Sequence, residues 1–169
     1  MMKRRSLLLT TAATAALPAP LLLGGCGFAP RRPQPLAFQS LALVGFAPRS
    51  PMAATLLRSL PADVTVVDAP QQAQVVLESL LERRERAISV TTGFGQVREF
   101  LLRVRFTWRL STRAGKPLVP PTELLLTRAN SYNEQIALAK EQEQVDIYQS
   151  LEEDMVQQVL RRLEGVREL

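Results

Sequence analysis

The chain has 169 residues, a formal net charge of +5, a single cysteine and no histidine. The missing histidine excludes nucleophilic sites of the Ser-His and Cys-His kinds and removes the usual ligand of zinc sites. One cysteine forms no disulfide within a chain, and the length is that of one domain able to bury a single core.

The N-terminal segment predicts an export signal with a lipid attachment site. The apolar run Leu7–Leu23 follows three basic residues, Lys3, Arg4 and Arg5. Two prolines interrupt the run, which favours a secretory signal over a spanning helix of about 20 unbroken apolar residues. Leu-Gly-Gly-Cys at positions 23–26 is similar to a bacterial lipobox. We therefore predict a signal peptide at residues 1–25 and cleavage before Cys26. We also predict covalent diacylglycerol and N-acyl lipid on Cys26, because two or more acyl chains give stable anchoring. The alternative is an ordinary signal peptide that ends near a cysteine.

The residues around the cysteine also bear on sorting. Gly27 stands where inner-membrane lipoproteins usually have Asp, so by resemblance we expect the outer membrane, with the domain on the periplasmic side. Arg4-Arg5-Ser6-Leu7-Leu8 matches a twin-arginine export signal in part. We expect residues 26–35 to form the lipidated cysteine and a Pro-rich tether, and residues 36–169 to form a single domain.

The charge balance argues against a nucleic-acid partner. Without residues 1–25 the chain has 18 basic and 16 acidic residues. Residues 82–113 carry eight Arg against three Glu, whereas residues 134–169 carry nine acidic and four basic side chains. The two segments are therefore of opposite sign.

The domain is predicted to begin with a strand and a short helix. Leu36–Phe46 contains an apolar run typical of a buried strand. Ser50 and Pro51 are typical of a helix start, and Pro61 ends the helix. Val64–Val67 is a short β-branched run.

A long antiparallel hairpin is the clearest prediction. Residues 97–112 are expected to form one arm. Within it, residues 100–110 have apolar side chains at the even positions and, except for Leu101, polar side chains at the odd positions, which is the period of a half-buried strand. Residues 74–90 form the other arm, and the glycines Gly93 and Gly95 between the arms are expected to supply positive φ. Trp108 is expected in the core. Residues 113–117 are a second turn and Thr122–Tyr132 a further strand.

The C-terminal segment predicts an amphipathic helix. Apolar residues recur at three- and four-residue spacing, namely Val145, Tyr148, Leu151, Met155, Val159, Leu163 and Val166. This stripe is expected to pack on the sheet.

Enzymatic function is disfavoured. The only candidates for carboxylate chemistry are Glu78, Glu82, Glu85 and Glu99 on the predicted hairpin. Arginines neighbour them and no Gly-rich or aromatic cleft is evident, so we interpret them as solvated strand residues. We expect no enzyme, no metal site and no cofactor.

The pieces together resemble the LPS-assembly lipoprotein family LptE. The similarity spans essentially the whole chain after residue 25 and rests on Cys26-Gly27-Phe28, the Gly95-Gln96 hairpin tip, the run Ala137-Leu-Ala-Lys-Glu-Gln-Glu-Gln144 and the helix end Leu160–Leu163. The resemblance implies an α+β two-layer sandwich, with two helices on a four-stranded, mostly antiparallel sheet. It also implies a lipoprotein that plugs and helps assemble the outer-membrane β-barrel LptD and binds lipopolysaccharide during its delivery to the cell surface.

The resemblance suggests one site residue directly. Lys140 occupies the position of a family basic residue implicated in contacting LPS; alternatively it is a solvated lysine at a helix start. The family's tip arginine is absent, because Thr91, Thr92 and Gly93 stand there. Other LPS-binding candidates are Arg98, Arg103, Arg105 and Arg109, which alternatively face LptD or water. The competing function is that of an auxiliary lipoprotein in another envelope transport system of the ABC type.

Overall fold

The computed structural model describes residues 34–169. The predicted signal peptide, Cys26 and all but the last two residues of the Pro-rich tether therefore lie outside the described residues. Residues 34–169 belong to one compact unit.

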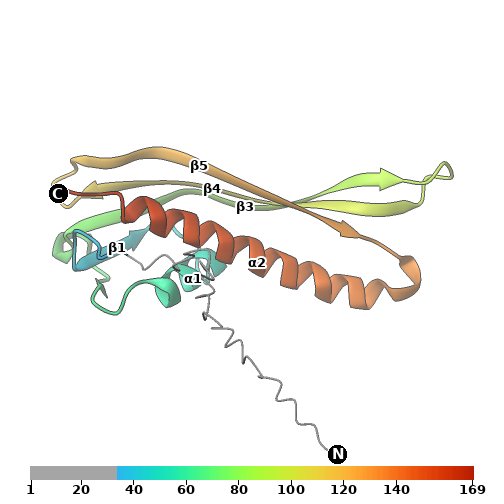
Figure 1. The fold of residues 1–169 in the computed structure, drawn as a ribbon, viewed down its shortest axis with the longest axis horizontal. Coiled ribbons are helices and arrows are strands. Elements are labelled where there is room, and N and C mark those ends of the chain that lie inside the picture. The colour runs from blue at the N-terminus through green and yellow to red at the C-terminus, as the bar shows by residue number, and fades with distance from the viewer. Residues whose placement is uncertain (1–33) are drawn as a thin grey trace, which may run out of the picture. The chain divides into compact units, whose positions relative to one another are not determined.

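Three long antiparallel strands form most of the sheet: β3 (Val75–Thr91), β4 (Val97–Thr112) and β5 (Pro117–Ser131). The predicted hairpin is β3–β4, whose tip extends beyond the end of β5 (Figure 1). Burial in β4 alternates as the sequence predicts, and its even side chains Leu102, Val104, Phe106, Trp108 and Leu110 are buried.

Two short strands complete the sheet in the order β2-β1-β3-β4-β5. β1 (Ser40–Val44) lies parallel to β3, and β2 (Thr65–Val66) lies parallel to β1. The α+β class is confirmed, but the expected four-stranded, mostly antiparallel sheet is wrong in detail because five strands are present and two pairings are parallel. Parallel neighbours require a crossover, which helix α1 (Pro51–Ser59) provides between β1 and β2; the 3-10 turn η1 (Pro70–Gln72) leads on to β3.

Helix α1 begins where the Ser-Pro pair predicts. The Ser50 hydroxyl accepts a hydrogen bond from the Ala53 N–H at 2.9 Å, the usual cap of a helix N-terminus. It also donates to the Glu82 carboxylate at 2.6 Å, which ties the helix to β3. Gly45, just after β1, has φ +76°, and a Cβ there would collide with the Ser79 carbonyl oxygen. This position therefore requires glycine.

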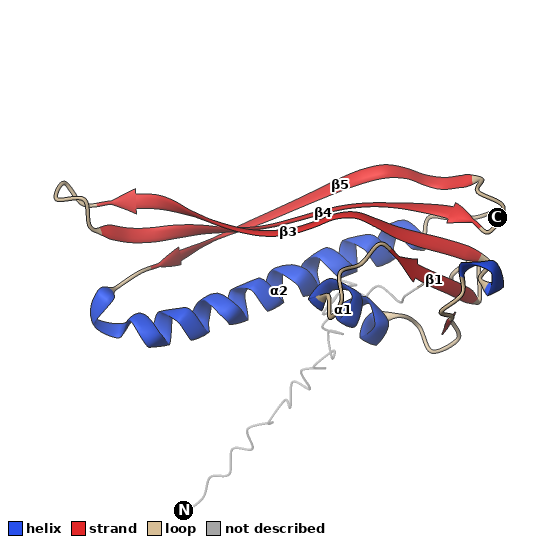
Figure 2. Ribbon diagram, turned by 180° about the vertical axis from the view of Figure 1, so that it is seen from behind, coloured by secondary structure: helices blue, strands red, loops and turns tan. Residues whose placement is uncertain are grey.

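Helix α2 (Ala137–Leu163) lies with α1 on one face of the sheet (Figure 2). The predicted apolar stripe is confirmed from Tyr148 to Leu163, whereas Val145 is 54% exposed and Val166 follows the helix. The helix begins earlier than the stripe, after the 3-10 turn η2 (Glu134–Ile136). Every buried residue of α2 lies at or after Tyr148, so the first part of the helix has only partly buried and exposed side chains.

The two hairpin turns share one geometry. In each, a threonine N–H donates to the carbonyl four residues on, and the glycine between them has positive φ: Thr92 and Gly95 at the tip, Thr112 and Gly115 at the base. Gly93 does not adopt positive φ, so the expectation that both tip glycines would do so is half right. Strand β5 begins at Pro117 rather than at Thr122, because a strand at the edge of a sheet tolerates proline.

Candidate functional site

The odd-numbered arginines of β4 lie on the sheet face turned away from the helices, here called the open face. Two of them are engaged by glutamates of the neighbouring strands. Arg109 contacts Glu78 at 2.6 and 2.8 Å, and Arg105 contacts Glu123 at 3.1 Å. Cross-strand pairs of this kind neutralise the charge that the sequence alone presents as a basic surface.

Arg103 differs from its neighbours on the open face. It is half-buried and makes no ion pair within residues 34–169, although the cross-strand register places it opposite Glu85. Arg83 contacts that carboxylate instead, at 3.5 Å. Among the three predicted arginines of the open face, Arg103 therefore has the guanidinium most available to an added anion.

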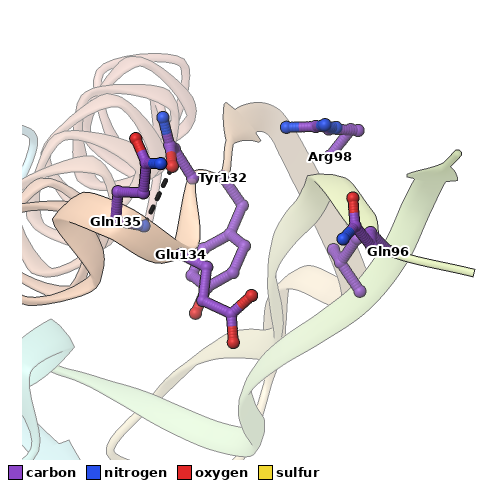
Figure 3. A pocket seen from close by; sticks show the side chains of 7 residues that line it. Gln96, Arg98, Tyr132, Glu134 and Gln135 are labelled. Carbon is purple, nitrogen blue, oxygen red and sulfur yellow. Dashed lines mark hydrogen bonds between the residues drawn. The ribbon is translucent and has the colours of Figure 1, made fainter.

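Arg98 lies on the other side, in a cavity of about 400 Å³ near the hairpin tip, here called the distal cavity (Figure 3). The cavity is lined by residues 96–98 of the hairpin and 132–135 of the β5–α2 connection. The Tyr132 N–H donates to the Arg98 carbonyl at 2.7 Å, and the Tyr132 ring packs edge-on against Phe100 at 5.2 Å. These contacts hold the cavity walls together. Glu134 also lines it, so the cavity presents charges of both signs.

Lys140 occupies the first turns of α2, at the same end of the molecule. Its ammonium group donates to the Ser131 hydroxyl at 2.9 Å and to the Glu143 carboxylate at 2.7 Å, and its side chain is 16% exposed. Ser131 pairs with Glu99 in the sheet, next to Arg98. The structure thus brings Lys140 and Arg98 to one end of the sheet, but Lys140 already ties α2 to the end of β5.

Sequence reasoning missed the arginines on the helix side of β3. Arg84 forms a two-point ion pair with Glu152 of α2, at 2.6 and 2.8 Å, and lies 5.3 Å from the centre of the Tyr148 ring. The hydrogen bond to Glu152 raises the pKa of Arg84. The available signal was the position of Glu152 inside the apolar stripe, since a carboxylate there requires a cation from the sheet.

A second such arginine lies nearer the tip. The Arg86 guanidinium stacks over the Phe100 ring at 4.6 Å and donates to the Gln144 side chain at 3.2 Å. Together with Arg84 it joins the sheet to α2 by polar contacts. The strand arginines are thus divided between the two faces of the sheet.

The four carboxylates considered for catalysis each have another contact. Glu78 and Glu85 contact arginines, Glu82 accepts from Ser50, and Glu99 accepts from the Ser89 hydroxyl at 2.8 Å. No group of acidic side chains within residues 34–169 has the arrangement of a metal site. In the same part of the chain, no helix combines the length and the apolar character that crossing a membrane requires.

Comparison with known proteins identifies relatives of the whole folded region. The model of the LptE family, described as lipopolysaccharide-assembly, matches residues 38–163. An uncharacterized lipoprotein B from Nitrosomonas europaea is 26% identical, with a TM-score of 0.70, over 82% of this chain and 91% of that one. A comparison with curated proteins finds no match.

Two further structures share the fold. A minor lipoprotein from Acinetobacter baumannii is 23% identical, with a TM-score of 0.63, over 78% of this chain and 94% of that one. The rare lipoprotein B from Shewanella oneidensis is 20% identical, with a TM-score of 0.64, over 75% of this chain and 94% of that one.

Proposed function

Because this chain belongs to the LptE family of lipopolysaccharide-assembly lipoproteins, we propose that it plugs and helps assemble the LptD β-barrel and binds lipopolysaccharide on its way to the cell surface. The family is non-enzymatic and does not depend on a cofactor. The proposal includes a lipid anchor on Cys26 that holds the domain at the periplasmic side of the outer membrane. The observation that carries it is the family match, which spans nearly all of the folded domain.

The open face supports the role of a plug. The interior of a membrane barrel is polar, and the open face offers charges that are largely neutralised within the sheet by the Arg109–Glu78 and Arg105–Glu123 pairs. Such a face enters a polar lumen without leaving many uncompensated charges. Leu81 and Leu125, which are 39% and 45% exposed, add apolar contact area to it.

The lipopolysaccharide contacts are proposed for the basic residues of β4 and α2. Guanidinium groups pair with phosphates through two parallel hydrogen bonds. Arg98 and Arg103 make no ion pair within residues 34–169, so their guanidinium groups can bind a phosphate without breaking an existing ion pair. The other candidates already form ion pairs with glutamates, which must break before a phosphate binds; these are Arg105, Arg109 and Lys140.

Copurification tests the partner. The tagged full chain, extracted from membranes in detergent, is expected to recover LptD. Recovery of an inner-membrane ABC complex instead would favour the auxiliary-transporter alternative and contradict the proposal.

A charge exchange tests Lys140 separately from its structural role. Lys140→Glu alone places two glutamates side by side and is expected to loosen the start of α2, whereas Lys140→Glu with Glu143→Lys keeps an ion pair and moves the cation by one turn. If Lys140 contacts LPS, the exchanged pair keeps the stability of the native chain but binds LPS more weakly than an Arg113→Glu control. Equal LPS affinity for the exchanged pair and the native chain would restrict Lys140 to its structural contact.

The two unpaired arginines are compared with a paired one. We expect Arg98→Glu and Arg103→Glu to weaken LPS binding more than Arg109→Glu, because Arg109 is already held by Glu78. LPS affinity is measured at two salt concentrations. Equal losses that salt abolishes would indicate general electrostatics rather than a site.

A further inference from the structure

Free edges of the sheet differ in how they are protected. An unpaired edge strand offers a row of backbone N–H and C=O groups to any other strand, and proteins block it with short strands, prolines, bulges or charges. The order β2-β1-β3-β4-β5 leaves three edges within the described residues: β2, the part of β3 beyond its pairing with β1, and β5.

Strand β2, the free part of β3 and the first part of β5 each have one of these protective features. Strand β2 has only two residues. The free part of β3 begins with a register shift around Leu80 and continues as five consecutive charged residues, 82–86. The first part of β5 contains three prolines, Pro117, Pro120 and Pro121.

The remainder of β5, Thr122–Ser131, lacks these features. It contains no proline and no glycine, and its pairing with β4 runs without a register shift. Its two charged residues are occupied, Glu123 by Arg105 and Arg128 by Asp154 at 3.4 Å. Leu125 is 45% exposed. Ten residues of regular edge are thus open to pairing.

A groove runs beside this unprotected edge. It has a volume of about 400 Å³ and lies between residues 126–128 of β5 and one side of α2, whose lining residues are Leu151, Asp154, Gln157, Gln158 and Arg161. Leu126 is partly exposed and supplies apolar surface, and the two glutamines can donate or accept hydrogen bonds. The Arg161 guanidinium is exposed and has no acidic partner within residues 34–169.

We propose that Thr122–Ser131 and this groove bind an extended segment of a partner protein as a sixth strand. Backbone hydrogen bonds to the edge supply the affinity, and alternate side chains of the segment enter the groove. One apolar side chain lies against Leu126, and one acidic side chain pairs with Arg161.

The chemistry of the edge favours this occupant over two others. Lipid tails offer no hydrogen bonds to the free backbone groups of β5. A second copy that paired through the same edge would have to supply the acidic partner of Arg161. The only acidic residue within Thr122–Ser131 is Glu123, and Arg105 already holds its carboxylate. The inference does not depend on the identity of the barrel partner.

The test uses the purified full chain in detergent and three labelled synthetic peptides of ten residues. The first alternates valine with threonine and carries one terminal glutamate, the second is the same peptide N-methylated at alternate residues, and the third has lysine in place of glutamate. Binding is followed by fluorescence anisotropy, and amide hydrogen exchange locates it. We expect the first peptide to bind and to slow exchange within residues 122–131, and the N-methylated peptide not to bind.

Charge reversal in the groove supplies the matched control. We expect the lysine peptide to bind roughly fivefold more weakly than the glutamate peptide, the scale of one exposed ion pair, and Arg161→Glu to reverse that order. Arg113→Glu, the same change in the base turn outside the groove, leaves the order unchanged. Absence of binding, binding without slower exchange in 122–131, or a dimer of the free chain protected at the same residues would each overturn the proposal.

Discussion

The ion pair between Arg84 and Glu152 allows a sharp prediction, because its two partners differ in burial. The Glu152 side chain is 4% exposed and that of Arg84 is 41% exposed. Replacing Arg84 by Met leaves a carboxylate buried without a cation, whereas replacing Glu152 by Gln leaves a guanidinium that water reaches. The two changes remove the same contact and are expected to have unequal costs.

The magnitude follows from the geometry. Removing one partner of a buried pair costs about 3–5 kcal/mol, and the partial exposure of Arg84 places Arg84→Met near about 3 kcal/mol. Glu152→Gln keeps one acceptor for the guanidinium, so its cost is about 1–2 kcal/mol, near that of a single hydrogen bond. Arg84→Met combined with Glu152→Leu removes both charges and should recover most of the loss.

Urea unfolding of the full chain at pH 7, followed by circular dichroism, provides the free energies. The control is Arg109→Met, which breaks the similarly close pair with Glu78 where the carboxylate is 32% exposed; its expected cost is below about 1 kcal/mol. Equal costs for Arg84→Met and Glu152→Gln, or a double variant no more stable than Arg84→Met, would refute the reasoning.

Two further predictions concern the backbone and the pH dependence of stability. Gly45→Ala should destabilise the fold by about 3 kcal/mol, because strain at positive φ adds to the collision with the Ser79 carbonyl. Gly115 also has positive φ but lies in open space, so Gly115→Ala should cost only about 1 kcal/mol. Equal urea midpoints for the two variants would show that the collision has no effect. Burial raises the pKa of Tyr148, and its hydroxyl donates to the Glu85 carbonyl at 2.8 Å. The unfolded chain loses the tyrosine proton first, so the contribution of Tyr148 to stability is complete below about pH 10 and falls as pH rises further. Tyr148→Phe should cost about 1 kcal/mol at pH 7. Its stability deficit should shrink as pH rises above about 10, and a deficit that stays constant there contradicts the assignment.

Local periodicity predicts the hairpin well, because alternation in β4 directly reports which side chains face the core. The same alternation places the odd arginines together but does not show that Glu78 and Glu123 lie beside Arg109 and Arg105. Those pairs depend on register between strands, which follows from turn length and from the shift near Leu80. The basic surface that the sequence indicates is therefore mostly balanced in the structure.

The parallel part of the sheet was beyond local reasoning. Strand β2 has two residues, and its pairing with β1 depends on the crossover through α1 rather than on any pattern of its own. The contacts that hold the first turns of α2 are also beyond local reasoning, although the sequence places Lys140 at the helix start. Residues 137–147 bury no side chain, so no apolar stripe marks them, and contacts such as Lys140 with Ser131 and Gln144 with Arg86 replace it.

The uneven burial along α2 has a consequence for motion. Its later turns share the apolar core with β4, so exposing them requires unfolding of the whole domain. Its earlier turns are held by hydrogen bonds and ion pairs at the surface, which water replaces at little cost. The hairpin tip and the start of α2 should therefore open and reclose many times during the life of one folded molecule. This end of the molecule can then adjust its outline to a partner while the opposite end keeps a fixed shape.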